Sequence, residues 1–247
     1  YLFPLSQIEF SQFENYKQTT ENLEERLLYG CYPEVTHYES WKEKQEYLRE
    51  IVNSYLLKDI LIFDGIKNAD KIYDLLRLIA FQVGKEVSLQ ELGNQLNLSK
   101  NTVEKYLDLL SKVFVIFKIE GFSRNLRKEI TKSSRWYFYD NGIRNAILNN
   151  FNTLNNRTDI GDLWENYLAS ERIKKQHYQK IVKQNYFWRT YDQQELDWLE
   201  TEAETMEGYE FKWNENRKSK IPTAFAKAYP EAIFTVINKQ NYLDFIT

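Results

Sequence analysis

The sequence predicts a mixed α+β or α/β protein with a helical N-terminal region (residues 1–70), a winged helix-turn-helix (71–148) and a C-terminal α/β domain (149–247). Three observations predict this class. Glycine and proline are sparse, apolar residues recur three and four positions apart up to about residue 80, and short β-rich runs alternate with helical segments after residue 181. With 247 residues and 43% apolar content, the chain can form two modest domains or one large one.

Composition excludes several classes of protein. A net charge of -3 excludes a uniformly basic coat for nucleic acid, although it allows a local basic patch. The single cysteine, Cys31, cannot form an intramolecular disulfide, so we expect a reducing, cytoplasmic location. The two histidines, His37 and His177, are too few for a histidine-based zinc site, so metal chemistry would have to use carboxylates. No apolar run approaches the roughly 20 residues of a membrane span, so no membrane partner is expected.

The elements follow from local patterns. In the N-terminal region, apolar spacing over residues 41–56 and 75–80 predicts helices, and residues 30–33 break the helical pattern. Ser88 and Glu91 form a capping-box pattern before a short helix, and Ser99 can cap the next helix. Strands at 113–119 and 136–139 follow, and two short helices before a hairpin predict a winged helix. Asp140 and the two residues after it close the hairpin and open a helix over 143–148, and an Asn-rich linker at 149–156 comes next. The C-terminal prediction is a helix at 163–174, strands at 181–190, 195–200 and 208–213, a helix at 223–228 and a strand at 233–238.

Four residues of the last part could carry chemistry. Glu165 lies on its first helix, Asp197 lies in the following strand, and Glu210 and Lys212 lie two apart in the next. Because side chains alternate along a strand, Glu210 and Lys212 share one face, and we expect the aromatic residues between them to be buried on the other. Carboxylates on neighbouring strands can hold Mg²⁺ or Mn²⁺, and a lysine can stabilise developing negative charge on a phosphate. The alternative is an amphipathic hairpin whose charged face is only solvated.

The order of these residues resembles that of the PD-(D/E)xK nuclease superfamily. A narrower resemblance covers nearly the whole chain, to the C-terminal half of predicted prokaryotic AAA-type ATPases. It rests on four segments and on the opening residues 3–6: Tyr-Gly-Cys-Tyr-Pro-Glu-Val at 29–35, Arg-Trp-Tyr-Phe-Tyr-Asp-Asn-Gly at 135–142, Leu-Trp-Glu-Asn at 163–166, and Phe-Trp-Arg-Thr at 187–190.

That family implies an ATPase core followed by a winged helix and a restriction-endonuclease-like domain of uncharacterised role. It implies that Glu165, Asp197 and Glu210 are metal ligands and that Lys212 is the catalytic lysine. Asp197 and Glu210 would also be catalytic residues. It further suggests that Arg189 and Thr190 contact phosphate. The chain begins at Tyr1 without an initiator methionine, and we expect it to be a piece of a longer protein. The sequence contains no P-loop motif, so ATP would bind only in the full-length parent and no ATPase activity is expected here.

A basic loop is the candidate DNA contact of the winged helix, and the alternative is that the winged helix packs against the neighbouring domain and the loop is only solvated. It carries the following cations against one acid, Glu129: Arg124, Arg127, Lys128, Lys132 and Arg135. The second helix is mixed, because Glu104 and Asp108 interrupt its lysines. Two hypotheses remain open: a Mg²⁺- or Mn²⁺-dependent deoxyribonuclease that contacts DNA, or a silent DNA- or protein-binding module that regulates the ATPase. Self-association would occur through the missing core.

Overall fold

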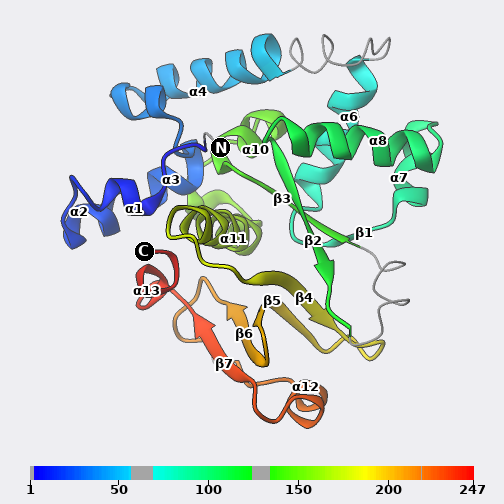
Figure 1. The fold of residues 1–247 in the computed structure, drawn as a ribbon. Helices are drawn as coiled ribbons and strands as arrows, with labels where there is room; N and C mark the ends of the chain where they lie inside the picture. The colour runs from blue at the N-terminus through cyan, green and yellow to red at the C-terminus, as the bar shows by residue number, and fades with distance from the viewer. Residues whose placement is uncertain (1–2, 57–68, 124–133, 218) are drawn as a thin grey trace.

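The computed structural model describes residues 3–56, 69–123, 134–217 and 219–247 (Figure 1). The N-terminal half runs through these elements: α1 (Gln7–Phe10), α2 (Tyr16–Glu21), α3 (Leu23–Tyr29), the 3-10 turn η1 (Pro33–His37), α4 (Trp41–Glu50), the π-helical turn η2 (Ile51–Leu56), α6 (Ala69–Phe81), β1 (Glu86–Val87), α7 (Leu89–Leu96), α8 (Lys100–Lys112), β2 (Ile116–Gly121), β3 (Ser134–Phe138) and α10 (Asn141–Leu148). The C-terminal half continues through η3 (Leu154–Asn156), α11 (Ile160–Tyr178), β4 (Gln184–Arg189), β5 (Glu195–Glu202), β6 (Thr205–Phe211), α12 (Thr223–Ala228), β7 (Ile233–Ile237) and α13 (Tyr242–Ile246). The protein is therefore mixed α/β, as the sequence predicts.

Seven strands form one mixed sheet in the order β1-β3-β2-β4-β5-β6-β7 (Figure 1). The β2–β4 and β6–β7 pairs are parallel, and the other neighbours are antiparallel. The β2–β4 pair joins the hairpin of the middle part to the C-terminal strands, with Glu120 opposite Tyr186 and Gly121 opposite Phe187. The sheet is thus continuous across residues 148–149, where the sequence predicts a boundary between two domains.

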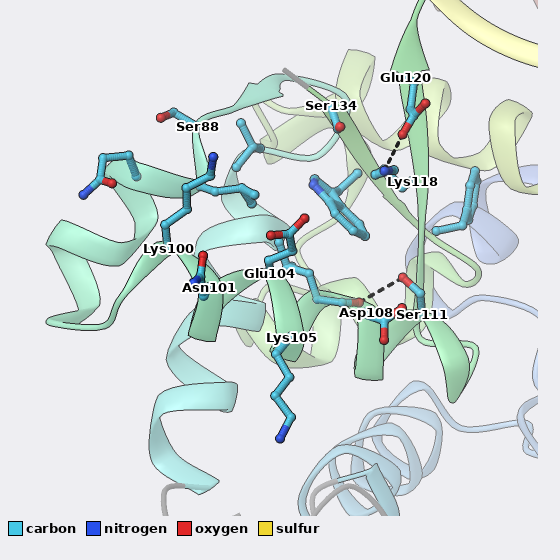
Figure 2. A pocket seen from close by; sticks show the side chains of 16 residues that line it. Ser88, Lys100, Asn101, Glu104, Lys105, Asp108, Ser111, Lys118, Glu120 and Ser134 are labelled. Atoms are coloured by element: carbon cyan, nitrogen blue, oxygen red, sulfur yellow. Dashed lines mark hydrogen bonds and ion pairs between the residues drawn. The ribbon is translucent and has the colours of Figure 1, made fainter. Parts of the chain in front are cut away.

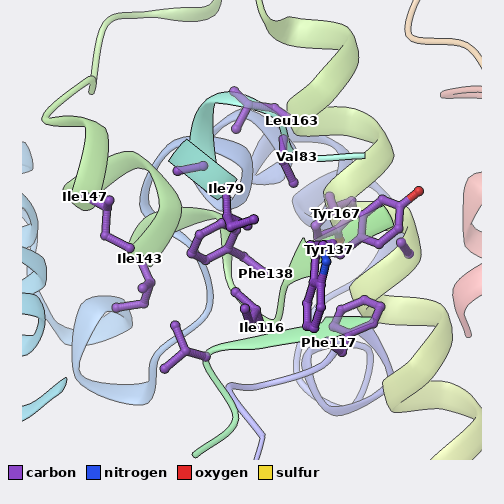
Figure 3. Packing of buried hydrophobic residues seen from close by; sticks show 14 of the residues in the cluster. Ile79, Val83, Ile116, Phe117, Tyr137, Phe138, Ile143, Ile147, Leu163 and Tyr167 are labelled. Carbon is purple, nitrogen blue, oxygen red and sulfur yellow. The ribbon is translucent and has the colours of Figure 1, made fainter. Parts of the chain in front are cut away.

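The main hydrophobic core also crosses that boundary. Figure 3 shows its centre, where side chains from α6, β2, β3, α10 and α11 meet: Ile79, Val83, Ile116, Phe117, Tyr137, Phe138, Ile143, Ile147, Leu163 and Tyr167. Helix α11 packs against β3 and β6, and α13 packs against α11. A second, smaller cluster joins α12 to β4 and β5, where the rings of Trp188 and Phe225 lie 5.1 Å apart. Helix α11 is consequently enclosed by other elements and presents its polar side chains to buried partners.

The helix starts follow the predicted capping residues. The Ser88 hydroxyl accepts a hydrogen bond from the Glu91 amide at 3.3 Å, and the Ser99 hydroxyl accepts one from the Thr102 amide at 3.1 Å. Asp140 caps α10 by accepting from the Ile143 amide at 3.1 Å. Because each cap satisfies an amide that lacks an intrahelical partner, these short polar side chains fix where the helices begin.

Some predicted boundaries move, and one predicted linker is packed. Strand β2 begins at Ile116 rather than at residue 113, because α8 continues to Lys112 and Phe114 has a φ of 59°, which interrupts a strand. In the Asn-rich segment 149–156, the Phe151 ring stacks on Tyr29 at 5.8 Å and Leu154 is buried. The apolar residues of this segment therefore anchor it to the helical region, and it is not a free linker.

Candidate functional site

The β5–β6 hairpin brings Asp197 and Glu210 together. Trp198 pairs with Tyr209, and continuing this antiparallel register puts Asp197 opposite Glu210. The Phe211 amide donates a hydrogen bond to Asp197 Oδ2 at 2.8 Å, which fixes the orientation of that carboxylate. Directly opposite residues in an antiparallel pair have neighbouring side chains on one face. Two acids distant in sequence thus lie side by side.

Lys212 follows the last residue of β6 and contacts Glu210, one of these two acids. Its ammonium forms an ion pair with Glu210 Oε1. Its backbone amide donates to the Ile237 carbonyl at 2.9 Å, so the ladder between β6 and the strand β7 continues past Phe211. The side chain keeps 21% of its exposure, which leaves it accessible to a bound anion.

Glu165 reaches the cluster from α11 and is 8% exposed. The Tyr137 hydroxyl donates to its Oε1 at 2.8 Å. The backbone of Gly84 approaches so closely that a Cβ there would lie 2.6 Å from the same oxygen. Next to it, Lys85 pairs with Asp162 at 3.0 Å and its charge acts on Glu165. The surroundings of Glu165 are built by residues for which the sequence predicts no role.

Arg135 lies between the two halves of the cluster. It is 3% exposed, and its Nη2 donates to Glu195 Oε2 at 2.7 Å. Its Nη1 lies 3.8 Å from Glu165 Oε1 and 4.0 Å from Asp197 Oδ1. The guanidinium also lies over the Phe187 ring, 4.5 Å from its centre.

The expected contact of Arg135 with DNA phosphates therefore needs correction. Because side chains alternate along β3, Arg135 and Tyr137 point toward α11 while Trp136 points to the opposite face. Arg135 is a buried counter-ion of the acidic cluster rather than an exposed cation of a basic loop.

Burial makes ionisation of these carboxylates unfavourable. Burial and the charge of Asp197 raise the pKa of Glu165 to about 8, even though Arg135 and the Tyr137 hydroxyl act in the opposite direction. Burial raises the pKa of Asp197, and burial together with Asp197 raises the pKa of Glu210. Acids held together in this way lose their protons only at a cost, which a further cation would reduce.

This cost of ionisation is the basis on which the site fits a divalent cation, because a bound cation stabilises the charged form of each acid. Three carboxylates supply the oxygen ligands that Mg²⁺ and Mn²⁺ prefer. They do not form a preassembled cage, because no three acidic, histidine or cysteine side chains among the described residues are grouped closely enough to hold a metal. The donor chemistry and charge of the cluster fit the ion, whereas the present placement has Arg135 beside two of the three acids.

The remaining residues predicted to contact phosphate fall into two groups. Arg189 pairs with Glu86 at 2.9 Å, and Thr190 lies in the turn after β4, where its hydroxyl accepts from the Gln194 amide at 3.2 Å. Within the described residues, neither forms a hydrogen bond or ion pair with the carboxylates of Glu165, Asp197 or Glu210. Four cations of the basic loop lie outside the described residues: Arg124, Arg127, Lys128 and Lys132.

A separate pocket of about 1070 Å³ lies on the other face of the β2–β3 hairpin, beside α8 (Figure 2). Its rim carries both signs of charge, in agreement with the mixed face of the second predicted helix: Lys100, Glu104, Lys105, Asp108, Lys118 and Glu120. Lys118 forms an ion pair with Glu120 across this rim. Such a balanced surface does not by itself attract a phosphate backbone.

The charge state of Glu165 has a consequence for stability. Its pKa is about 8 in the folded protein and 4.5 as a free side chain, so between these values the folded state binds more protons than the unfolded state. Stability from this group is therefore fully present below pH 4.5 and lost as the pH rises through 8. Glu165→Gln should match wild type near pH 4.5 and exceed it by on the order of 2–4 kcal/mol at pH 9 without metal. Urea unfolding in EDTA at both pH values measures this, and a constant difference between the two proteins would contradict it.

Comparison with known proteins places the chain in a family. A family model described as a domain of unknown function (DUF8612) matches residues 20–154, more than half of the chain. The chain belongs to this family. A second model, a domain of unknown function (DUF4143), matches residues 160–244, which hold Glu165, Asp197, Glu210 and Lys212. The DUF4143 domain is found in proteins associated with AAA ATPases.

The curated relatives are themselves uncharacterised. A protein of Haemophilus influenzae is 26% identical over 152 residues, covering 58% of this chain and 38% of the relative. A protein of Methanocaldococcus jannaschii is 24% identical over 138 residues, which cover 49% of this chain and 31% of the relative. A protein of Mycobacterium tuberculosis is 25% identical over 124 residues, which cover 49% of this chain and 27% of the relative. The chain thus spans less than two fifths of the length of these relatives. No solved structure matches it significantly, and no described helix has the length and apolar character to cross a membrane.

Proposed function

We propose that the C-terminal part of this chain is a PD-(D/E)xK-type, restriction-endonuclease-like domain that hydrolyses DNA with Mg²⁺ or Mn²⁺. One observation carries the proposal. Glu165 from α11, Asp197 from β5, and Glu210 with Lys212 from the end of β6 belong to one charged cluster, linked through Arg135 and the β5–β6 pairing. Burial raises the cost of ionising all three acids, and the charge of Asp197 raises it further for Glu165 and Glu210, which structural ion pairing alone does not require.

Each residue has a role in this proposal. Glu165, Asp197 and Glu210 would hold the metal, whose chemistry is to polarise the phosphate and lower the pKa of water. The Phe211 amide orients Asp197, and the Tyr137 hydroxyl orients Glu165. Lys212, half-buried beside Glu210, stabilises the negative charge that develops on the phosphate.

The middle part supports the proposal of a winged helix that contacts DNA. Helices α6, α7 and α8 precede the β2–β3 hairpin, and β1 pairs with β3 to complete a three-stranded edge of the sheet. The contact would use the basic loop between β2 and β3, since the α8 face is mixed in charge. In the full-length parent, which we propose to be a cytoplasmic AAA-type ATPase, ATP binding and self-association would belong to the preceding core.

One observation favours a second candidate, a silent DNA- or protein-binding module that regulates the ATPase. The Arg135 guanidinium lies within 4.0 Å of both Glu165 and Asp197, and among the described residues no three possible ligands are grouped for a metal. If this arrangement persists in solution with metal present, the acids serve to hold the fold.

Cleavage of single- and double-stranded DNA by this chain tests the two candidates. With Mg²⁺ or Mn²⁺ we expect cleavage that EDTA abolishes, and we expect no ATP hydrolysis. DNA binding without cleavage at any metal concentration would favour the silent module.

A further inference from the structure

Arg135 holds the place of a cation in the acidic cluster. Its Nη2 is anchored by Glu195 at 2.7 Å, a normal length for a charge-assisted hydrogen bond. The distances from Nη1 to Glu165 and Asp197, 3.8 and 4.0 Å, are too long for hydrogen bonds. Arg135 is thus bound tightly at Glu195 and only electrostatically at the two predicted metal ligands.

A second feature indicates that the guanidinium has not found a full set of partners. Arg135 Nε is buried and has no hydrogen-bond partner among the described residues. An arginine that evolved only to neutralise two carboxylates would be expected to meet them in a bidentate arrangement. Here Nη1 lies beyond hydrogen-bond distance of both acids, and the buried Nε has no hydrogen-bond partner in the described part of the chain.

A divalent ion held by Glu165 and Asp197 would lie close to this guanidinium. Like charges at such separations in a buried site repel strongly, because little water is present to screen them. The two cations therefore compete for the same carboxylates, and the weaker contacts of Nη1 are the ones that give way.

We propose that Arg135 is a resident counter-ion that competes with the divalent cation, so that metal binding turns its guanidinium away from Glu165 and Asp197. This inference rests on the proposed function, because it takes these acids as the metal ligands. It assigns Arg135 a regulatory role: it keeps the acids paired when metal is absent and sets the metal concentration at which the site fills.

Calorimetric titration of the chain with Mn²⁺ alone, without DNA, tests the inference. Arg135→Gln removes the charge while keeping a polar side chain, and we expect it to bind Mn²⁺ at least tenfold more tightly than wild type. Arg135→Lys keeps the charge and should bind within about threefold of wild type. Arg189→Gln, which removes an arginine paired with Glu86 and not with the cluster, should also stay within that range.

Thermal unfolding gives an independent readout. Without metal, Arg135→Gln should melt below wild type, because the acids lose a counter-charge, and Mn²⁺ should raise its melting temperature by more than it raises that of wild type. If the variant does not fold without metal, a wild-type crystal structure with Mn²⁺ decides. Displacement of Nη1 from both carboxylates is then expected, and an unmoved Arg135 beside bound Mn²⁺ overturns the inference.

The outcomes separate this inference from the proposed function. Equal or weaker Mn²⁺ binding by Arg135→Gln, with binding retained in wild type, overturns the competition and leaves the metal site intact. Absence of Mn²⁺ binding in every folded variant overturns both. Binding by Arg135→Gln alone supports both, with Arg135 as a complete block.

Discussion

Replacing Lys212 by alanine is expected to reduce metal-dependent DNA cleavage by at least about a hundredfold, the usual effect of removing one group that stabilises transition-state charge. Lys212 is the cation in direct contact with Glu210, and its charge also acts on Asp197. Mn²⁺ affinity should stay the same or increase, because the carboxylates remain and a neighbouring positive charge is lost. Single-turnover cleavage with Mn²⁺ above saturation separates the chemical step from metal binding.

Lys239→Ala is the matched control for this variant. Lys239 pairs with Glu215 at 3.6 Å and lies over the ring of Trp213, the residue that follows Lys212. Within the described residues, Lys239 forms no ion pair with the acidic cluster. It should cleave DNA at the wild-type rate. Equal cleavage by Lys212→Ala and wild type would remove Lys212 from the site, whereas an equal loss in both variants would indicate a general effect of surface charge.

Replacing Gly142 by alanine is expected to destabilise the fold by about 3 kcal/mol or more. A Cβ at Gly142 would overlap the carbonyl oxygen of Tyr29 and lie 2.9 Å from Asp140 Oδ1. Neither the Tyr29 carbonyl nor the Asp140 carboxylate can move away without disturbing other contacts. Tyr29 ends α3, which packs against α10, and the buried Asp140 carboxylate accepts from the Cys31 amide at 2.7 Å and the Ile143 amide at 3.1 Å.

Gly161→Ala provides the comparison. Gly161 lies in the first turn of α11, and an added Cβ would meet no atom within 4 Å. Because alanine favours helix over glycine by up to about 1 kcal/mol, this variant should match or exceed the wild-type stability. Urea unfolding of both variants gives the free energies of unfolding. A loss below about 1 kcal/mol for Gly142→Ala would mean that the contact between α3 and α10 is looser than described.

The sequence was sufficient where the signal is local. Ser88, Ser99 and Asp140 start their helices because short polar side chains cap free amides, whatever the tertiary context. The proximity of Asp197 and Glu210 could be expected because consecutive strands commonly pair, and alternation then puts both acids on one face. Their chemical role stays a prediction.

The sequence was insufficient where position depends on distant partners. Arg135 belonged by sequence to a basic loop, and only its orientation toward α11 and its pairing with Glu195, 60 residues later, make it part of the acidic cluster. The parallel β2–β4 pair likewise has no local signal, because its strands are far apart in the chain. Tyr137 and Gly84 were missed for the same reason. Tyr137 lies in the segment 135–142, which carried part of the family resemblance, and this was the one indication in the sequence of a role for Tyr137 at the site.

The location of bound Mn²⁺ tests the central claim most directly. Anomalous diffraction from crystals of this chain grown with Mn²⁺ should show one strong peak in contact with carboxylate oxygens of Asp197 and Glu210, with Glu165 turned toward it. An ordered cluster with no peak at saturating Mn²⁺, and Arg135 still beside Glu165 and Asp197, would contradict the account and identify the acids as part of a structural ion network.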